Sequence, residues 1–139
     1  MLDTVVMVAA IRSRAGASNA LLSMALLRRY TLLVSVPLMV EYQDVMSRPE
    51  HLHASGLDRQ DVEDLLDAIA SVAAPVRLAY LWRPAAVDPN DDMVLETAVN
   101  GQAAAIVTFN ARHLAKPAER FGLAVIRPAE ALTILEKRT

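Results

Sequence analysis

Three carboxylates lie within five residues in the second half of the chain. Asp88, Asp91 and Asp92 flank a Pro-Asn pair, and an apolar segment with helical spacing begins directly after them. Aspartates at the start of a helix cap it and complement its dipole, which contributes about 0.3–1 kcal/mol each. Capping needs one or two of them, whereas three clustered carboxylates repel each other, and hard cations such as Mg²⁺ or Mn²⁺ prefer oxygen ligands. The cluster predicts a metal site, with simple capping as the alternative.

The composition limits which other chemistries are open to the chain. Its 139 residues, 54% of them hydrophobic, predict one domain spanning 1–139 with a continuous core. Cysteine is absent, which excludes thiolate ligands, disulfides and a cysteine nucleophile. No apolar stretch approaches the ~20 residues of a membrane span, and no leader pattern is visible, so we expect a cytoplasmic protein without a membrane partner.

A net charge of −2 argues against broad attraction to polyanions. It does not exclude an enzyme with acids at its centre and bases at its rim, because the two cancel in the total. The candidates for such a rim are Arg12, Arg14, Arg28, Arg29, Arg83, Arg112, Lys116 and Arg120. Scattered surface charge explains any one of them equally well.

Strand-like and helix-like segments alternate along the chain. The patterns predict strands at 2–8, 31–34, 103–108 and 123–126, and helices at 18–27, 38–46, 59–73 and 128–136, with another helix after the acidic cluster. Residues 76–81 are either a short strand or an extended connection. Such alternation predicts an α/β fold with a mostly parallel central sheet covered by helices on both faces.

In sheets of this type the functional crevice lies beyond the carboxyl ends of the strands. Asp3 interrupts the first predicted strand, where an unpaired carboxylate costs several kcal/mol. Glu41 lies one turn into the helix after the second strand, Asp92 begins a helix, and Asn110 follows the strand at 103–108. Each has a plain alternative. Asp3 could lie in a frayed terminus and Glu41 could be an exposed helical glutamate. Asp92 could be a helix cap and Asn110 a turn residue. Together they are the candidate catalytic groups.

Other chemistries find less support. His51 and His53 lie in a predicted loop without a third ligand, which argues against zinc. A phosphatase of the haloacid dehalogenase type with Asp3 as nucleophile needs a second acid two residues later, where Val5 stands. A receiver domain needs a lysine after a late strand, and Asn110 follows there instead.

An ordered series of short motifs resembles PIN-domain proteins. The series is Leu2-Asp3-Thr4, Ser35-Val36-Pro37-Leu38 with Glu41-Tyr42, Asp88-Pro89-Asn90-Asp91-Asp92, Ile106-Val107-Thr108-Phe109-Asn110, and Gly122 with Pro128-Ala129-Glu130. More narrowly, the chain is similar to the branch that supplies the toxins of toxin–antitoxin systems. The motifs follow the order and spacing of the family over nearly the whole chain. Any one motif is weak evidence, but the ordered set is specific.

The resemblance implies a three-layer α/β/α ribonuclease that uses Mg²⁺ or Mn²⁺. By position, the metal ligands would be Asp3, Glu41 and Asp92, with Asp88 and Asp91 as auxiliary ligands. The reaction would be hydrolysis of RNA by a metal-activated water, leaving a 5′-phosphate. The resemblance further implies that an antitoxin protein binds over the crevice and that the protein is a homodimer.

Three departures from the family pattern favour an alternative, a catalytically degenerate PIN-like module that binds RNA or a partner protein. Val5 replaces the asparagine of the usual Asp-Thr-Asn motif, which removes a polar group beside Asp3. Family members have several more residues before this aspartate, so an upstream start of the chain is one expectation. Asn110 stands where many members have an acid; it would orient a water or substrate oxygen without adding charge.

Overall fold

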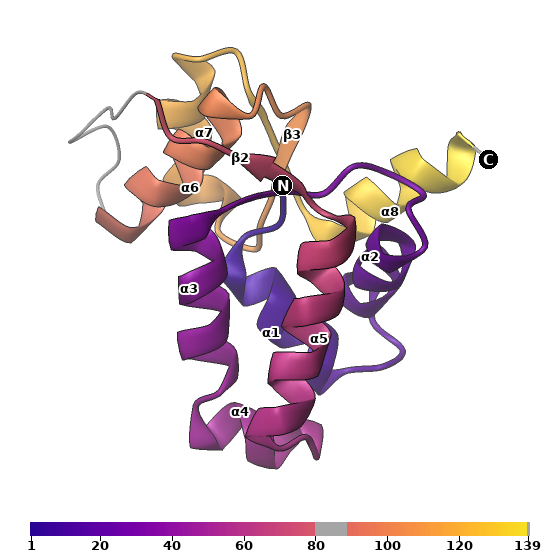
Figure 1. The fold of residues 1–139 in the computed structure, drawn as a ribbon. Coiled ribbons are helices and arrows are strands. Elements are labelled where there is room, and N and C mark those ends of the chain that lie inside the picture. Colours follow the sequence, from indigo (N-terminus) through magenta and orange to yellow (C-terminus); the bar gives the residue numbers. More distant parts are fainter. Residues whose placement is uncertain (80–88, 139) are drawn as a thin grey trace.

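The computed structural model of the protein describes residues 1–79 and 89–138, with only the backbone for 89–91. These residues form eight helices and four short strands (Figure 1). The helices are α1 (Thr4–Arg12), α2 (Ala17–Leu26), α3 (Val36–Met46), α4 (Pro49–Ser55), α5 (Arg59–Val72), α6 (Pro89–Asn100), α7 (Ala111–Glu119) and α8 (Pro128–Lys137). The strands are β1 (Leu33–Ser35), β2 (Ala74–Val76), β3 (Ala105–Val107) and β4 (Ala124–Ile126).

The strands pair in parallel, as the alternation predicts. Within the described residues β1 pairs with β2 and β3 pairs with β4, and Leu2 adds an isolated parallel bridge to Val107. The first residues of the chain therefore lie alongside β3 (Figure 1). The α/β class is confirmed, with more helix and shorter strands than expected. Since paired parallel strands share one direction, the Leu2 bridge and β3 both lead toward the same edge.

The predicted strand at 2–8 is wrong, because the chain is helical from Thr4. Asp3 is the N-cap residue, and its carboxylate accepts a hydrogen bond from the Thr4 backbone N–H at 2.8 Å. Helix α1 packs against α2, α3 and α4 and is buried on most of its surface (Figure 1). A helix that is buried on most of its surface needs apolar residues on most of its faces, so its sequence resembles that of a buried strand.

Besides α1, two further helices were not predicted. His51 and His53 lie in α4, not in a loop; Pro49 begins this helix and Gly56 ends it with a φ of 75°. Both are recognised end signals, so the sequence did carry the information. Helix α7 contains Pro117 in its interior, a residue that normally argues against a helix.

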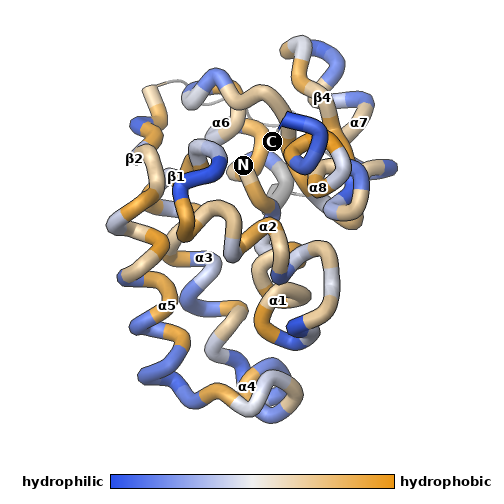
Figure 2. Tube along the Cα trace, turned by 90° about the vertical axis from the view of Figure 1, so that its right-hand side faces the viewer, coloured by the Kyte–Doolittle hydropathy of each residue, from blue (hydrophilic) through white to orange (hydrophobic). Residues whose placement is uncertain are grey.

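The other helices agree with their patterns. Ser35 caps α3 and accepts a hydrogen bond from the Leu38 N–H, with Pro37 in the first turn. Asp58 caps α5 in a reciprocal capping box with Asp61. Apolar and polar residues alternate along α5 (Figure 2), and its buried face packs against α2 and α3. No helix in the described part of the chain is long and apolar enough to cross a membrane.

Gly101 marks a close approach between the end of α6 and the first strand pair. A Cβ atom here would lie 2.8 Å from Val76 Cγ2 and 3.0 Å from Leu33 Cδ1. We expect Gly101→Ala to lower the free energy of unfolding by about 1–3 kcal/mol, the usual cost of overpacking, measured by urea denaturation. Gly16→Ala is the matched control, because its nearest neighbour is the flexible Ser13 side chain at 3.3 Å. Equal stability of the two variants would contradict this packing.

Candidate active site

Asp3 is held at the point where the Leu2 bridge ends and α1 begins. Its backbone N–H donates to the carbonyl of Val107 at 2.9 Å, which fixes it beside the end of β3. Its Oδ1 accepts from the Thr4 N–H at 2.8 Å and its Oδ2 accepts from the Thr108 hydroxyl at 2.7 Å. Asp3 is only 6% exposed. Both oxygens of this buried carboxylate are therefore oriented by donors on either side.

Glu41 reaches the same place from α3. The hydroxyl of Thr4 donates to Glu41 Oε2, while the backbone of Thr4 donates to Asp3. One threonine thus links two carboxylates that are far apart in the sequence. Helix α3 is aligned with this site because it begins directly at the end of β1. We call Asp3, Thr4, Glu41 and Thr108 the Asp3 network.

Thr108 connects the network to the loop before α7. Its side chain is fully buried, donates to Asp3, and accepts from the backbone N–H of Asn110 at 3.0 Å. Asn110 itself is exposed and occupies the N-cap position of α7 without a capping hydrogen bond from its side chain. The structure therefore connects Asn110 to the network through its backbone.

Asp92 lies in the first turn of α6 and is 3% exposed. Helix α6 packs against α3, β1 and β3, the elements whose ends surround the Asp3 network. Within the described residues, however, no three or more acidic, histidine or cysteine side chains are grouped closely enough to hold a metal ion. Asp88 lies outside the described residues, as does the side chain of Asp91. The structure joins Asp3 with Glu41 and does not group Asp92 with them.

A buried polar row on α6 was not predicted. Glu96 is 1% exposed and Thr97 is fully buried. The Thr97 hydroxyl donates to the Met93 carbonyl at 2.9 Å, so its single proton is used and Ser35 must donate in the 2.7 Å contact between the two hydroxyls. This row ties α6 to the start of α3. The spacing of four residues between Asp92 and Glu96, which places both on one helical face, was the available signal.

Burial dominates the electrostatics of the site. Desolvation raises the pKa of Asp3, while the hydrogen bonds from Thr108 and Thr4 act to lower it. Desolvation also raises the pKa of Tyr42 well above its usual range, with smaller contributions from the charges of Asp3 and other neighbours. Tyr42 is therefore neutral, and its hydroxyl donates to the carbonyl of Leu2, the residue before Asp3. An ionised Asp3 in these surroundings would be stabilised by a cation.

This raised pKa predicts a pH dependence of stability. The folded protein holds the Asp3 proton more tightly than the unfolded chain does, so this stabilising contribution is complete below the ordinary pKa of 3.8 and is lost as the pH rises through the raised value. In EDTA, the stability of the wild type relative to Asp3→Asn should fall from acid to neutral pH, as measured by urea denaturation. Mn²⁺ should then restore stability to the wild type alone. A relative gain with rising pH in EDTA would mean that the pKa of Asp3 is depressed.

The oxygen ligands that the Asp3 network offers fit a hard divalent cation. Mg²⁺ in proteins is usually held by one or two carboxylates, with water and substrate phosphates completing its shell. Asp3 and Glu41 supply two carboxylates, and each oxygen of Asp3 accepts one hydrogen bond and keeps a further lone pair. Thiolate ligands are absent because the chain has no cysteine. These residues could therefore hold Mg²⁺ or Mn²⁺.

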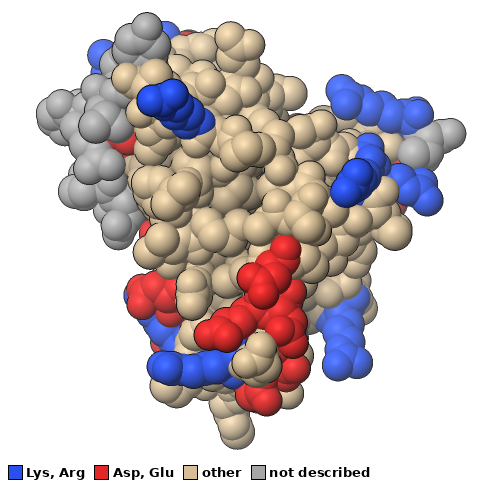
Figure 3. All heavy atoms as spheres, viewed as in Figure 1, with Lys and Arg blue, Asp and Glu red and all other residues tan. Residues whose placement is uncertain are grey.

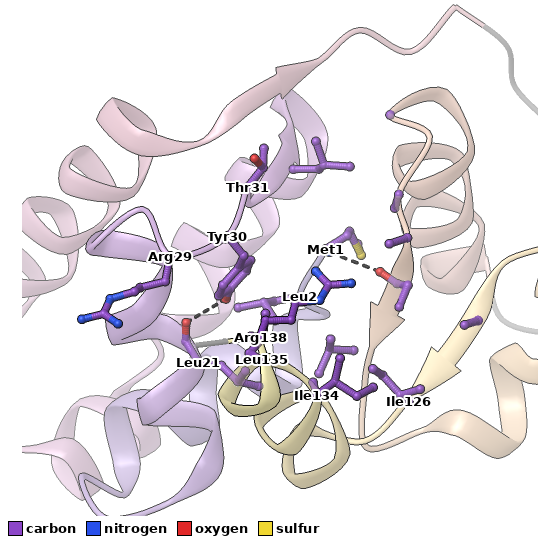
Figure 4. Close-up of a pocket in the computed structure, with 18 of the residues that line it drawn as sticks. Met1, Leu2, Leu21, Arg29, Tyr30, Thr31, Ile126, Ile134, Leu135 and Arg138 are labelled. Carbon is purple, nitrogen blue, oxygen red and sulfur yellow. Dashed lines mark hydrogen bonds between the residues drawn. The ribbon is translucent and has the colours of Figure 1, made fainter.

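A cavity formed by described residues lies elsewhere in the fold. It has a volume of about 720 Å³ and is lined by residues of α2, β3, β4 and α8 and the segment before β1 (Figure 4). On one wall the Tyr30 hydroxyl donates to the Leu21 carbonyl at 2.7 Å, and on another the Met1 nitrogen donates to Ala105 at 3.3 Å. None of the predicted site residues lines it. We therefore assign the chemistry to the Asp3 network and not to this cavity.

Surface charge is unevenly distributed around the fold. Acidic side chains gather over α5, and lysine and arginine lie around the edges of the same view (Figure 3). The acidic residues of α5 that are exposed are Asp61, Glu63, Asp64 and Asp67. This face of α5 is unsuited to a polyanion, so a nucleic acid would have to approach the strand ends from another side.

The chain belongs to the PIN-domain family, whose α/β fold is of the nuclease type. The model of that family, described as PIN domain, matches residues 1–112. The match includes the whole Asp3 network, α6 and the start of α7. PIN domains are generally nucleases and typically use divalent metal ions. Neither a curated protein nor a solved structure matches the chain.

Proposed function

We propose that this PIN domain is a metal-dependent endoribonuclease centred on Asp3. The observation that carries the proposal is the buried Asp3 carboxylate, whose two oxygens are oriented by Thr4 and Thr108 while the same Thr4 holds Glu41. Two carboxylates whose oxygens are already oriented by hydrogen bonds could bind a divalent cation, and such a cation could act on a phosphate group. A purely structural cap would need only the hydrogen bond to Thr4.

The residues of the chain would divide the work of hydrolysis. A bound Mg²⁺ or Mn²⁺ would lower the pKa of water and offset charge on the phosphate. Asp3 and Glu41 would hold the ion, and Thr4 and Thr108 would keep their oxygens in place before the substrate binds. Burial of Asp3 excludes bulk water from its oxygens and so strengthens its attraction to the cation.

Further members of the site are proposed from the family pattern. Asp92 is the third ligand, supported by its burial at the start of α6, next to α3. Asp88 and Asp91 are auxiliary ligands. Asn110 positions a water or substrate oxygen, and its exposed side chain one residue beyond Phe109 is accessible to a substrate.

The biological setting is proposed from the same motifs. RNA is the substrate, and the protein acts in the cytoplasm as the toxin of a toxin–antitoxin pair, with an antitoxin covering the strand ends. The protein is a homodimer, and its two parallel strand pairs form the central layer of a three-layer α/β/α sandwich. The parallel pairing of β1 with β2 and of β3 with β4 supports the last point.

The substrate class can be tested with the purified chain. In Mn²⁺ it should cut a structured RNA pool internally and leave 5′-phosphates, which a phosphate-dependent exonuclease would then degrade. A DNA pool of the same sequences should be cut more slowly. Products with 5′-hydroxyls, or equal cutting of the two pools, would contradict an endoribonuclease of this class.

A second candidate function is a silent module that binds RNA or a partner protein. The observation in its favour is Val5, which is 45% exposed directly after Thr4 and offers no polar group beside Asp3. RNA binding that persists in EDTA, with no cleavage in any divalent metal, would select this function.

A further inference from the structure

Arg127 lies directly beyond β4, next to the Asp3 network. The parallel register pairs Val107 of β3 with Ile126 of β4, and the Thr108 N–H donates to the Ile126 carbonyl at 3.0 Å. The two residues that follow this pair, Thr108 and Arg127, are therefore neighbours at the same edge. On its other side Thr108 donates from its hydroxyl to Asp3. Asp3, Thr108 and Arg127 thus form one row, in which neighbouring chains are about 4.8 Å apart.

The side chain of Arg127 begins on the same face of the strands as the side chain of Thr108. Successive side chains of an extended chain point to opposite faces. Ile126 lines the cavity of about 720 Å³ (Figure 4), and the next residue, Arg127, has an extended backbone with a φ of −84° and a ψ of 158°. Val107 also lines the cavity, and the next residue, Thr108, points away from it to Asp3. Arg127 is therefore directed to the face that carries the Asp3 network.

The fold gives no structural reason for an arginine at this position. Arg127 is the N-cap residue of α8, where short side chains that accept a hydrogen bond from the helix are preferred, and it makes no such bond. Its charge also lies at the positive end of the helix dipole, whereas Arg138 at the C-cap of the same helix lies at the favourable end. A residue that disfavours the helix it begins indicates a role outside the stability of the fold.

The guanidinium of Arg127 is available to a ligand. Arg127 is exposed, and it forms no ion pair with any residue that the structure describes. An arginine stays charged at any working pH, and its planar fork of donors matches two oxygens of a phosphate group. The family match ends at residue 112, so it does not include this arginine.

We propose that Arg127 is a catalytic residue that binds the phosphate group acted on at the Asp3 network. The inference rests on the proposed function, because that function places the phosphate at Asp3. The carboxylates of Asp3 and Glu41 repel a phosphate, and a cation on the neighbouring strand offsets this repulsion. The long side chain extends past Thr108, the one residue between Arg127 and Asp3 in the row. A guanidinium held there also stabilises the charge that develops on the phosphate oxygens during hydrolysis.

The first test compares the stability of Arg127→Asn with that of Arg138→Asn by urea denaturation. Asparagine is a preferred N-cap residue, so Arg127→Asn should raise the midpoint of unfolding. Arg138→Asn is the matched control, because it makes the same change at the other end of α8, and it should not raise the midpoint. A gain in stability establishes that any loss of function in Arg127→Asn comes from the missing guanidinium and not from damage to the fold.

The second test is binding of a short fluorescently labelled RNA, followed by anisotropy in EDTA at several salt concentrations. Arg127→Asn should weaken binding by about 10–100-fold, the equivalent of one lost hydrogen-bonded contact to a charged group. The slope of log Kd against log salt should fall by about 0.7, the value for one phosphate contact on a single strand. Arg127→Lys should keep this slope, and Arg138→Asn should keep both the slope and the affinity.

The third test is cleavage of the same RNA in Mn²⁺. Arg127→Asn should lower kcat by about 100-fold, as the loss of one donor to a developing charge does. Arg127→Lys should recover only part of this loss, because an ammonium group lacks the bidentate fork.

The outcomes separate this inference from the proposed function. Weaker RNA binding by Arg127→Asn, with no cleavage by the wild type in any divalent metal, would uphold the phosphate contact and reject the nuclease. Metal-dependent cleavage with the same kcat and KM in the wild type and in Arg127→Asn would uphold the nuclease and overturn the role of Arg127. An unchanged salt slope in Arg127→Asn, or an equal loss of affinity in Arg138→Asn, would also overturn it.

Discussion

Asp3→Asn will remove metal-dependent cleavage while the chain stays folded. The substitution deletes the charge that a divalent cation requires. It also places an amide NH₂ group opposite either the Thr4 N–H or the Thr108 hydroxyl, so one donor loses its acceptor. A metal ion contributes several kcal/mol to the transition state, so we expect kcat to fall by at least about 100-fold.

The matched control for this variant is Asp44→Asn. Asp44 lies on α3 close to Glu41 in sequence, but its carboxylate pairs with Arg48 and its side chain is 71% exposed. Such a surface pair contributes little, so this variant should keep wild-type cleavage. Circular dichroism and thermal melting of both variants establish that they are folded. An Asp3→Asn protein that is folded and cleaves RNA at the wild-type rate would remove Asp3 from the active site.

Thr108→Val will damage both stability and activity. The change keeps the shape of the side chain but deletes the donor to Asp3 and the acceptor for the Asn110 N–H. Unsatisfied buried groups cost about 1–3 kcal/mol, which should appear in urea denaturation. Loss of a group that orients a metal ligand typically lowers metal affinity or activity by about 10–100-fold. Mn²⁺ titration of the cleavage rate should therefore show a higher half-saturating concentration.

Two further variants show whether the hydroxyl is responsible. Thr108→Ser keeps the hydroxyl and should restore most of the metal affinity. Thr133→Val removes an exposed hydroxyl on α8 that donates only to the Ala129 carbonyl, so it should change neither property. A Thr108→Val protein with unchanged metal dependence would show that this hydrogen bond supports the fold alone.

The sequence predicted the helices whose end signals are local. Asp58 and its partner Asp61 are three residues apart, so the start of α5 could be located directly. The start of α1 could not, because the same aspartate that caps it was interpreted as an interruption in a strand. Capping and burial of a charge are both consistent with one polar residue before an apolar run. The structure distinguishes the two: the Asp3 N–H pairs with the Val107 carbonyl of β3, and helix α1 begins at the next residue, Thr4.

The same limit applies to the site. The rule that crevices lie beyond strand ends proposed Asp3 and Glu41 as members of one site, and Thr4 links the two carboxylates in the structure. It could not find Thr108, whose hydroxyl meets Asp3 across 105 positions of sequence. Glu96 was missed although it follows Asp92 by one turn. Hydrogen bonds between distant segments depend on packing that local patterns do not encode.

The proposed metal centre is tested most directly by RNA cleavage with the wild type in Mn²⁺ or Mg²⁺, beside the same protein in EDTA and the Asp92→Asn variant in metal. We expect cleavage that requires metal, is lost in EDTA and is abolished in a folded Asp92→Asn protein. Cleavage that survives EDTA would contradict the proposed metal centre, and a folded Asp92→Asn protein that cleaves at the wild-type rate would contradict Asp92 as its third ligand.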